Sequence, residues 1–417
     1  MDTGICDIPH VAFVAQLTRH LVSVPPMQAP STRRGSVALV IRLVLPDDGQ
    51  FPDIDSFKRA QQETTAALVQ TADRFLSQPE LASAKAQLLF IQRAKYPGDP
   101  WSGHIGFPGG KRDLADTSDR ATAERETLEE LGLDLADENN FVHLGCLDDA
   151  IAYSLFTSMQ MVVSPHVYLQ IRQSSPSLVL SDEVASAHWI GLEQAVHSIA
   201  RPARPCLASR RTIPIDIASR LFPAHCMLQP WWYRLFARVF GRLHYTVLPL
   251  KHTPENSLAR VNSQRASDTD NSSRSATSFA SDTELFLWGL SLNIFSNLMD
   301  LSLPIDPCLE CGAYSSLASP WPQMGPCLWT DVNYVVNKAH LLLWSPHRRK
   351  PWYVKVQRKP EGRVVGNNDD FFRVYHRTLW AVLPLSFSFK VAILGYLTKT
   401  VVSVAFRFAR GAMNTDL

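Results

Sequence analysis

The feature of this sequence that most constrains its fold is the stretch WSGHIGFPGGKRDLADTSDRATAERETLEELGLDL, at positions 101–135. A short strand-like run leads into a glycine-rich turn, and the turn leads into a segment with helical spacing. We expect the helix to begin near Ser118 and to end at Leu131, with Leu128 and Leu131 holding it to a sheet. The stretch therefore predicts a strand, a turn and a helix in close contact.

Three glutamates lie close together on this expected helix. At about 100° per residue, Glu126, Glu129 and Glu130 fall within an arc of roughly 100°, and like charges at these spacings repel by a few tenths of a kcal/mol per pair. Clustered carboxylates are hard oxygen ligands that suit Mg²⁺ or Mn²⁺. Such ions would relieve the repulsion, bind a diphosphate and help to ionise an attacking water. The alternative is a solvated helix in which Arg125 and Glu129 form an ordinary i,i+4 pair.

Two glycines, Gly109 and Gly110, stand in the turn before this helix. A glycine has no Cβ, so the backbone can approach a ligand closely at both positions. Arg125 is placed to orient one of the carboxylates by a charge-assisted hydrogen bond. The sequence thus predicts that Gly109 and Gly110 bind a ligand beside the carboxylates.

The same residues carry a resemblance to a known family. The pattern R-E-x-x-E-E-x-G-apolar, which resembles the second half of the Nudix box, is present at Arg125, Glu126, Glu129, Glu130, Gly132 and Leu133. Gly110 matches the leading glycine of the box with one extra residue before Arg125, Asp116 takes the place of its first glutamate, and Thr127 stands where an apolar residue is usual. Among Nudix subfamilies, FPGGKRDLADTSDRATAERE looks most like the coenzyme A diphosphatase group.

This resemblance implies a metal-dependent hydrolase that cleaves a diphosphate linkage in a nucleoside diphosphate derivative, with coenzyme A or acyl-CoA as candidate substrates. It implies that Glu126 is a general base or metal ligand, that Glu129 and Glu130 are metal ligands, and that Arg125 orients them. Glu183 is a candidate for a further carboxylate at the site, against the alternative of a surface strand residue. A second function fits the same motif: a catalytically silent Nudix-like module tethered to a membrane or a partner.

The segments around the motif mix strands and helices. Strands are expected at 36–45 and 86–94, a helix at 55–78, three strand-like runs between 141 and 192, and an apolar helix at 284–300. This order is typical of an α+β domain, and the resemblance implies the Nudix α/β/α sandwich around a mixed sheet, followed by a C-terminal hydrophobic helical extension.

Composition shifts divide the chain into several regions. We expect the following: an N-terminal arm at 1–35, a catalytic domain at 36–300 with an insertion at 201–283, a disordered Ser/Asn/Asp/Thr-rich part of that insertion at 253–283, a connecting region at 301–378, and a candidate membrane helix at 379–406. The last segment is long enough to cross a bilayer, yet Lys390 and Lys399 interrupt it. A membrane span, interfacial association and soluble packing of paired helices all remain open.

Bulk composition narrows the partners. A net charge of +2 gives no indication of a polyanionic partner, and no nucleic acid is expected. A small-molecule substrate of the nucleoside diphosphate type is what the Nudix resemblance implies. Seven scattered cysteines make a poor disulfide framework and favour a reducing compartment. The first residues lack the basic start of a signal or transit peptide, which predicts an intracellular protein. The pair Cys308 and Cys311 is a weak zinc motif on its own.

Overall fold

The structure, a computed structural model, describes a subset of the 417-residue chain. The described residues are 10–26, 28–29, 31–45, 52, 65–96, 103–153, 159–172, 176–193, 212–216, 242–251, 257–259, 285–302, 323–324 and 368–413. The chain divides into two compact units. The first comprises 1–214, 245–322 and 351–366, and the second comprises 215–244, 323–350 and 367–417.

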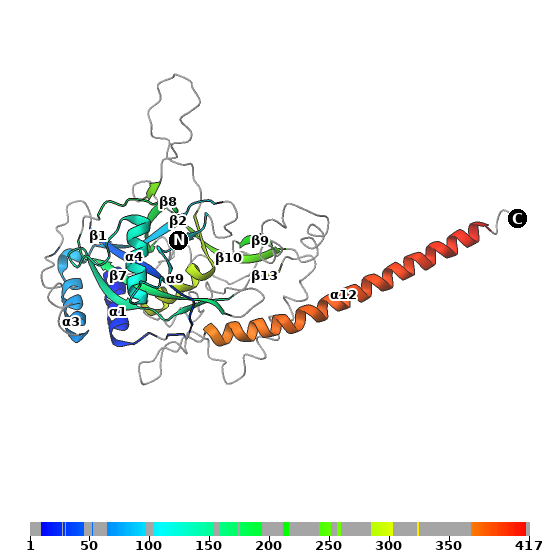
Figure 1. The fold of residues 1–417 in the computed structure, drawn as a ribbon, viewed down its shortest axis with the longest axis horizontal. Coiled ribbons are helices and arrows are strands. Elements are labelled where there is room, and N and C mark those ends of the chain that lie inside the picture. The colour runs from blue at the N-terminus through cyan, green and yellow to red at the C-terminus, as the bar shows by residue number, and fades with distance from the viewer. Residues whose placement is uncertain are drawn as a thin grey trace, which may run out of the picture. The chain divides into compact units, whose positions relative to one another are not determined.

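A mixed sheet forms the centre of the first unit (Figure 1). Among the described residues its strands are β1 (Arg34–Val44), β2 (Lys85–Arg93), β3 (Ile105–Gly106), β4 (Gly109–Lys111), β5 (Phe141–Cys146), β6 (Ala150–Tyr153), β7 (Met159–Gln170), β8 (Val184–Gly191) and β11 (Ser257–Ala259). The order is β11-β8-β2-β1-β7-β5, with β3 on β2, β4 on β1 and β6 on β7. Strands β1 and β7 are parallel, and the other described pairs of this sheet are antiparallel.

Helices cover both faces of this sheet. One face packs against α1 (His10–Ser23), α3 (Thr65–Leu76) and α9 (Gly289–Ser302), and the other packs against α4 (Asp119–Leu131). Successive side chains of strand β1 point to opposite faces of the sheet, and both sets are apolar. Leu39 and Ile41 lie in the first core, and Ala38 and Val40 lie in the second. All four side chains are fully buried. The α+β class and the sandwich expected from the sequence are confirmed.

The region 1–35 differs from the expected N-terminal arm. Helix α1 lies within it and belongs to the core, with Phe13, Val14, Leu17 and Leu21 buried along one side. These residues follow helical spacing. The expectation of an arm came from the Pro-, Ser- and Arg-rich stretch that follows the helix. The domain therefore begins before residue 36.

The segment 284–300 is only partly the expected helix. Its first residues form strand β12 (Leu285–Trp288), which pairs with Val247–Leu250 of β10 (Arg242–Leu250). Helix α9 begins at Gly289, whose φ of 63° lies in the left-handed region that favours glycine. The helical spacing of apolar residues in the sequence thus includes Leu285–Trp288, although pairing with β10 keeps these residues extended.

Several other expectations meet the structure in part. Residues 257–259 of the segment expected to be disordered form strand β11, which pairs with β8. Strand β9 (Thr212–Asp216) pairs with β10, and β13 (Gln323–Met324) pairs with Leu243 and His244 of β10. Apart from β13, the region 301–378 is described only at Leu301, at Ser302 and at the start of α12 (Asn368–Met413), and Cys308 and Cys311 lie outside the described residues.

Two histidines, His166 buried and His143 partly buried, face each other between β5 and β7. His143 Nε2 lies 3.1 Å from His166 Nδ1. Burial lowers the pKa of His143 to about 3 and that of His166 to about 4. Both rings are therefore neutral in the folded protein near pH 7.

We predict that Leu17→Ala lowers the free energy of unfolding by about 2–5 kcal/mol, because it leaves a cavity at a fully buried position. The measurement is urea unfolding followed by circular dichroism. Gln16→Ala is the control on the exposed side of α1 and should change stability by less than about 0.5 kcal/mol. Equal effects of the two changes would contradict the placement of α1 in the core.

The histidine pair predicts a loss of stability in acid. The unfolded state takes up protons near pH 6.5, whereas the folded state resists them down to about pH 4 and 3. Each histidine therefore contributes nothing above pH 6.5 and costs up to about 1.4 kcal/mol per pH unit as the pH falls below it. Urea unfolding between pH 7.5 and 5 measures the slope, and the double change His143→Gln with His166→Gln should flatten it. An unchanged slope in the double variant would contradict the prediction.

Candidate active site

Helix α4 has the two ends that the sequence predicts. Ser118 is its N-cap, in extended conformation, and the Ser118 hydroxyl accepts a hydrogen bond from the Ala121 N–H at 3.1 Å. At the other end Gly132 adopts a left-handed conformation, with φ of 65°, and donates its N–H to the Leu128 carbonyl. The helix is therefore fixed at both ends by its own sequence.

The side of α4 that faces the sheet is not the one expected. Leu131 is buried, but Leu128 is 48% exposed, so the prediction for Leu128 is wrong. Thr127 and Glu130 are buried instead. Thr127 satisfies its hydroxyl by donating to the Ala123 carbonyl at 2.7 Å, which explains how a hydroxyl is accommodated in an apolar family position.

Gly109 and Gly110 contact the glutamates of α4 directly. The Gly109 N–H donates to Glu130 Oε2 at 2.9 Å. Gly109 has φ of 145°, and a Cβ there would collide with the Ser36 carbonyl on β1. A Cβ on Gly110 would collide with the Glu126 carboxylate. Both positions thus require glycine so that strand β4 can lie between β1 and the two carboxylates.

Arg125 joins the carboxylates to the preceding loop. Its guanidinium donates to Asp116 through Nε and Nη2 at 2.9 and 3.0 Å, to Glu126 Oε1 at 3.0 Å, to Glu129 Oε2 at 2.9 Å and to the Lys111 carbonyl at 3.1 Å. The sequence predicted an arginine that orients one carboxylate, and the structure has one that contacts three. Arg125 therefore offsets much of the repulsion among the acids.

Asp116 is the buried partner of this arginine, with a side chain only 5% exposed. It also accepts hydrogen bonds from the Asp113 N–H and the Thr122 hydroxyl, each at 2.9 Å. The hydrogen bonds from Arg125 hold the pKa of Asp116 well below its usual range. The position of Asp116 in the motif was the sequence signal for this contact, because the first acid of the box falls there.

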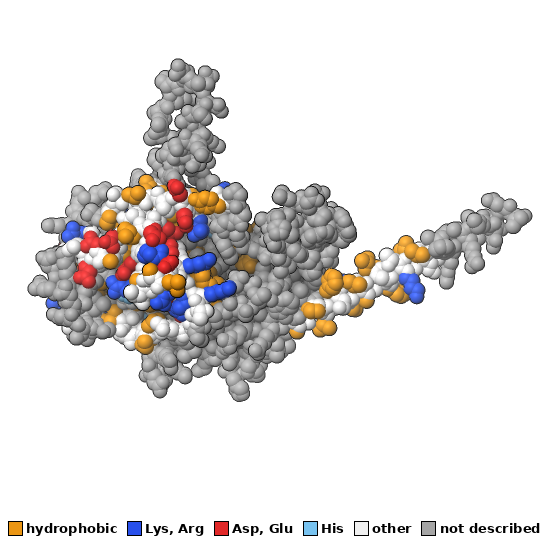
Figure 2. All heavy atoms as spheres, viewed as in Figure 1, with side chains coloured by type: hydrophobic (Ala, Val, Ile, Leu, Met, Phe, Trp, Pro, Cys, Tyr) orange, Lys and Arg blue, Asp and Glu red, His pale blue; other side chains and the backbone are white. Residues whose placement is uncertain are grey.

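Glu126 and Glu130 are costly to ionise. Burial raises the pKa of Glu130 to about 8, and the charges of Glu126 and Glu183 add to the shift. Burial also raises the pKa of Glu126, with Glu129 and Glu183 contributing. These mutual effects indicate that the four carboxylates share one electrostatic environment. Figure 2 shows acidic side chains gathered on the face of the first unit over α4.

Glu183 is held beside this group by the backbone that precedes β8. The Val179 and Ser181 N–H groups donate to the carbonyls of Leu131 and Glu130, at 2.8 and 3.0 Å. They satisfy two carbonyls at the end of α4 that have no partner within the helix. The Ala94 N–H donates to the Glu183 carbonyl at 2.7 Å, which ties the segment to the end of β2 as well.

The donor set fits a hard divalent cation in chemical type. Four carboxylates share a partly buried environment in which their negative charge raises the pKa of Glu126 and Glu130. In the part of the chain that the structure describes, no three His, Cys, Asp or Glu side chains are already arranged around one ion position. The reason is that Glu126 and Glu129 turn toward Arg125 and Glu130 turns toward Gly109.

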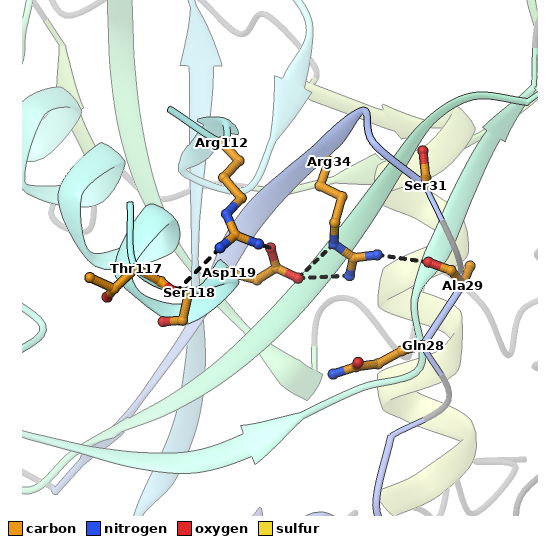
Figure 3. Close-up of a pocket in the computed structure, with 8 residues that line it drawn as sticks. All are labelled: Gln28, Ala29, Ser31, Arg34, Arg112, Thr117, Ser118 and Asp119. Carbon is orange, nitrogen blue, oxygen red and sulfur yellow. Dashed lines mark hydrogen bonds and ion pairs between the residues drawn. The ribbon is translucent and has the colours of Figure 1, made fainter. Parts of the chain in front are cut away.

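A pocket of ≈ 620 Å³ lies at the opposite end of α4 (Figure 3). Arg34 and Arg112 face it, and both donate to Asp119, at 2.8 and 3.1 Å. Arg34 also donates to Asp149 at 2.9 Å. Both guanidinium groups already have carboxylate partners. Their contacts therefore hold the start of α4 and the preceding N-terminal segment in place. It does not contain the glutamates.

Comparisons with known proteins bear on residues of this site. Residues 81–209 match the family described as NUDIX domain. An uncharacterized protein of Schizosaccharomyces pombe is 43% identical over 107 residues, which make up 25% of this chain and 32% of that protein. The chain thus spans about a third of the length of that relative.

Solved structures give matches of lower identity. The chain is similar to a MutT/nudix family protein from Enterococcus faecalis at 15% identity and a TM-score of 0.23, over 40% of this chain and 47% of that one. It is also similar to an Ap4A hydrolase of C. elegans at 16% identity and a TM-score of 0.23, over 39% and 83% of the two chains.

We predict that Asp116→Asn lowers the free energy of unfolding by about 1.5–3 kcal/mol at pH 7, because a buried guanidinium–carboxylate contact is lost. Since the folded-state pKa of Asp116 is depressed, the contribution is present above about pH 4 and is lost as the pH falls further. Denaturant unfolding at pH 7 gives the number.

Glu129→Gln is the matched control, because it removes a carboxylate from the same arginine at a side chain that is 59% exposed. It should cost less than about 1 kcal/mol. If Asp116→Asn lowers the free energy of unfolding by no more than Glu129→Gln does, the contact between Asp116 and Arg125 does not stabilise the fold as predicted.

Proposed function

We propose that the protein is a hydrolase that cleaves a diphosphate linkage in a nucleoside diphosphate derivative, since residues 81–209 match the family described as NUDIX domain. The observation that carries the proposal is the group of carboxylates on α4, in which Glu130 is buried, Glu126 is partly buried, and both have raised pKa values. A folded protein that had no use for these charges would gain stability by replacing them. Their retention in one place favours a function over a structural role.

The proposed roles follow from position. Glu126 lies between the exposed and the buried members of the group, against the backbone of Gly110, and is proposed as general base or metal ligand. Glu129 and Glu130 are proposed as metal ligands, one from the solvent side and one from the sheet side of α4. Arg125 holds Glu126 and Glu129 in place and keeps the loop that contains Asp116 against the helix.

Glu126, Glu129 and Glu130 would hold Mg²⁺ or Mn²⁺, with Glu183 as a further candidate. Bound there, the ion would neutralise a diphosphate and lower the pKa of a coordinated water. Glu129, which is largely exposed, can turn from Arg125 toward a ligand at small cost, since exposed ion pairs are weak. Glu130 is fixed by the Gly109 N–H and provides the rigid side of the site.

For the substrate we propose coenzyme A or an acyl-CoA as the first compounds to test. The support is the resemblance of FPGGKRDLADTSDRATAERE to the coenzyme A diphosphatase group. The side chains of this stretch have the arrangement that the motif needs, since Asp116 contacts both Arg125 and Thr122. The loops that would select the base or the acyl chain lie mostly outside the described residues.

The test is incubation of the full chain with Mg²⁺ or Mn²⁺ and a panel of nucleoside diphosphate derivatives that includes coenzyme A, with detection of monophosphate products. Glu129→Gln and Glu130→Gln should each lower turnover by about 10²–10⁴-fold, and removal of the ions with EDTA should abolish it. Product formation at an undiminished rate in both variants would refute the assignment of these ligands.

Glu124→Gln is the matched control for this experiment. Glu124 lies on the same helix but bonds to Arg120 and Tyr168, outside the carboxylate group. Its replacement should leave turnover within a few-fold of the unaltered chain. If no compound of the panel yields product while the chain binds one of them, the silent binding module replaces the enzyme.

A further inference from the structure

The second unit contains one long helix whose surface is apolar and uncovered. Helix α12 runs without interruption from Asn368 to Met413, through Pro384. Within it Pro384–Val404 forms a 21-residue stretch with a mean hydropathy of 1.3, none of which is buried. At 1.5 Å per residue this stretch is about 32 Å long, close to the roughly 30 Å of a bilayer's hydrocarbon core.

The apolar side chains lie on every side of this helix. At about 100° per residue, Val391, Ile393 and Leu394 point in three different directions, and Leu385 fills the remaining sector. These four are 53%, 42%, 63% and 71% exposed. Figure 2 shows apolar side chains along the visible face of the described part of α12. A second copy of the chain would cover one stripe, and a helix lying flat on a membrane would need a polar stripe. A helix that is apolar on every side is surrounded either by a protein core or by the hydrocarbon of a bilayer, and the described residues of this stretch are not in a protein core.

Several polar side chains inside the stretch have partners on the helix itself. Thr398 and Thr400 donate their hydroxyls to the carbonyls of Leu394 and Tyr396, at 2.7 and 2.8 Å. Lys390 donates from Nζ to the Ser386 hydroxyl at 2.9 Å. Its ammonium thus lies level with a residue about 6 Å nearer to the start of the stretch, in the direction that helical side chains favour.

The two lysines are compatible with the ends of a span. Ser386 lies two residues inside Pro384, so the Lys390 ammonium can reach the interface at that end. Lys399 lies five residues, or about 7.5 Å, from Val404, within reach of its stem at the other end. Arginines flank the stretch on both sides in the sequence, at Arg373, Arg377, Arg407 and Arg410. Charges at both ends and none held in the middle are typical of a transmembrane helix.

From these observations we propose that Pro384–Val404 crosses a lipid bilayer once, with the Lys390 ammonium at the interface on the side of the preceding residues. The partner is the hydrocarbon of the membrane and not a protein. The proposal is independent of the proposed hydrolase activity, and its test does not use that activity.

The experiment uses the full chain with a tag at each end, expressed in cells and recovered in sealed vesicles. The chain should stay in the membrane pellet after alkaline carbonate and leave it only in detergent. A protease outside the vesicles should remove one tag and spare the other. Release by carbonate, which a flat interfacial helix would show, overturns the proposal, and so does removal of both tags or protection of both.

Paired substitutions separate insertion from helix packing. Leu394→Lys with Leu397→Lys puts two charges at the middle of the stretch and should move most of the chain to the soluble fraction. Leu394→Ala with Leu397→Ala is the matched control, which loses the same contacts without adding charge, and it should stay in the pellet. Retention of the lysine variant, or equal release of both variants, would show that a protein partner and not lipid holds the helix.

Discussion

The guanidinium of Arg125 is the contact on which the arrangement of the site depends. Three carboxylates surround it, and one of them, Asp116, lies in the loop before α4 while Glu126 and Glu129 lie on the helix. A single cation therefore ties the loop to the helix and lowers the repulsion that the helix would otherwise carry. Since Asp116 is buried and Glu129 is exposed, the two sides of this contact differ in rigidity. The loop side is fixed, and the solvent side is free to respond to a ligand.

The sheet makes the second contribution through the backbone. Strand β4 pairs with β1, so Gly109 and Gly110 lie within reach of α4, and the Gly109 N–H points at Glu130. Neither glycine leaves room for a side chain. The glycine pair was interpreted from the sequence as an open approach for a ligand, which stays a prediction; in the structure a Cβ at Gly109 would meet the backbone of β1, and one at Gly110 would meet the Glu126 carboxylate. The turn and the helix are thus one packed unit, in which the backbone of the turn selects the orientation of the acids.

The sequence was most informative where local physics decides the structure. The ends of α4 follow from Ser118 and Gly132, and the two faces of the sheet follow from strict alternation in β1. It failed where a distant neighbour decides. Leu128 is exposed whereas Glu130 is buried and accepts a hydrogen bond from Gly109 on strand β4, and no local pattern encodes that contact. Residues 285–288 are extended because β10 pairs with them, although their spacing also fits a helix. For Glu183 the sequence offered only a candidate, since its place depends on the hydrogen bonds of Val179 and Ser181 to α4.

The position of α1 and α9 on one face of the sheet has a consequence for the order in which the chain can fold. Both helices pack into the core, yet one begins at His10 and the other ends at Ser302. A ribosome that has completed β8, at Gly191, must add about 110 further residues before α9 is available, which takes roughly 6–20 s. Throughout that interval the apolar stripe of α1 and the matching face of the sheet remain without their cover. The nascent chain should therefore be a client of chaperones that shield apolar surface during synthesis, until the last helix of the domain closes the core.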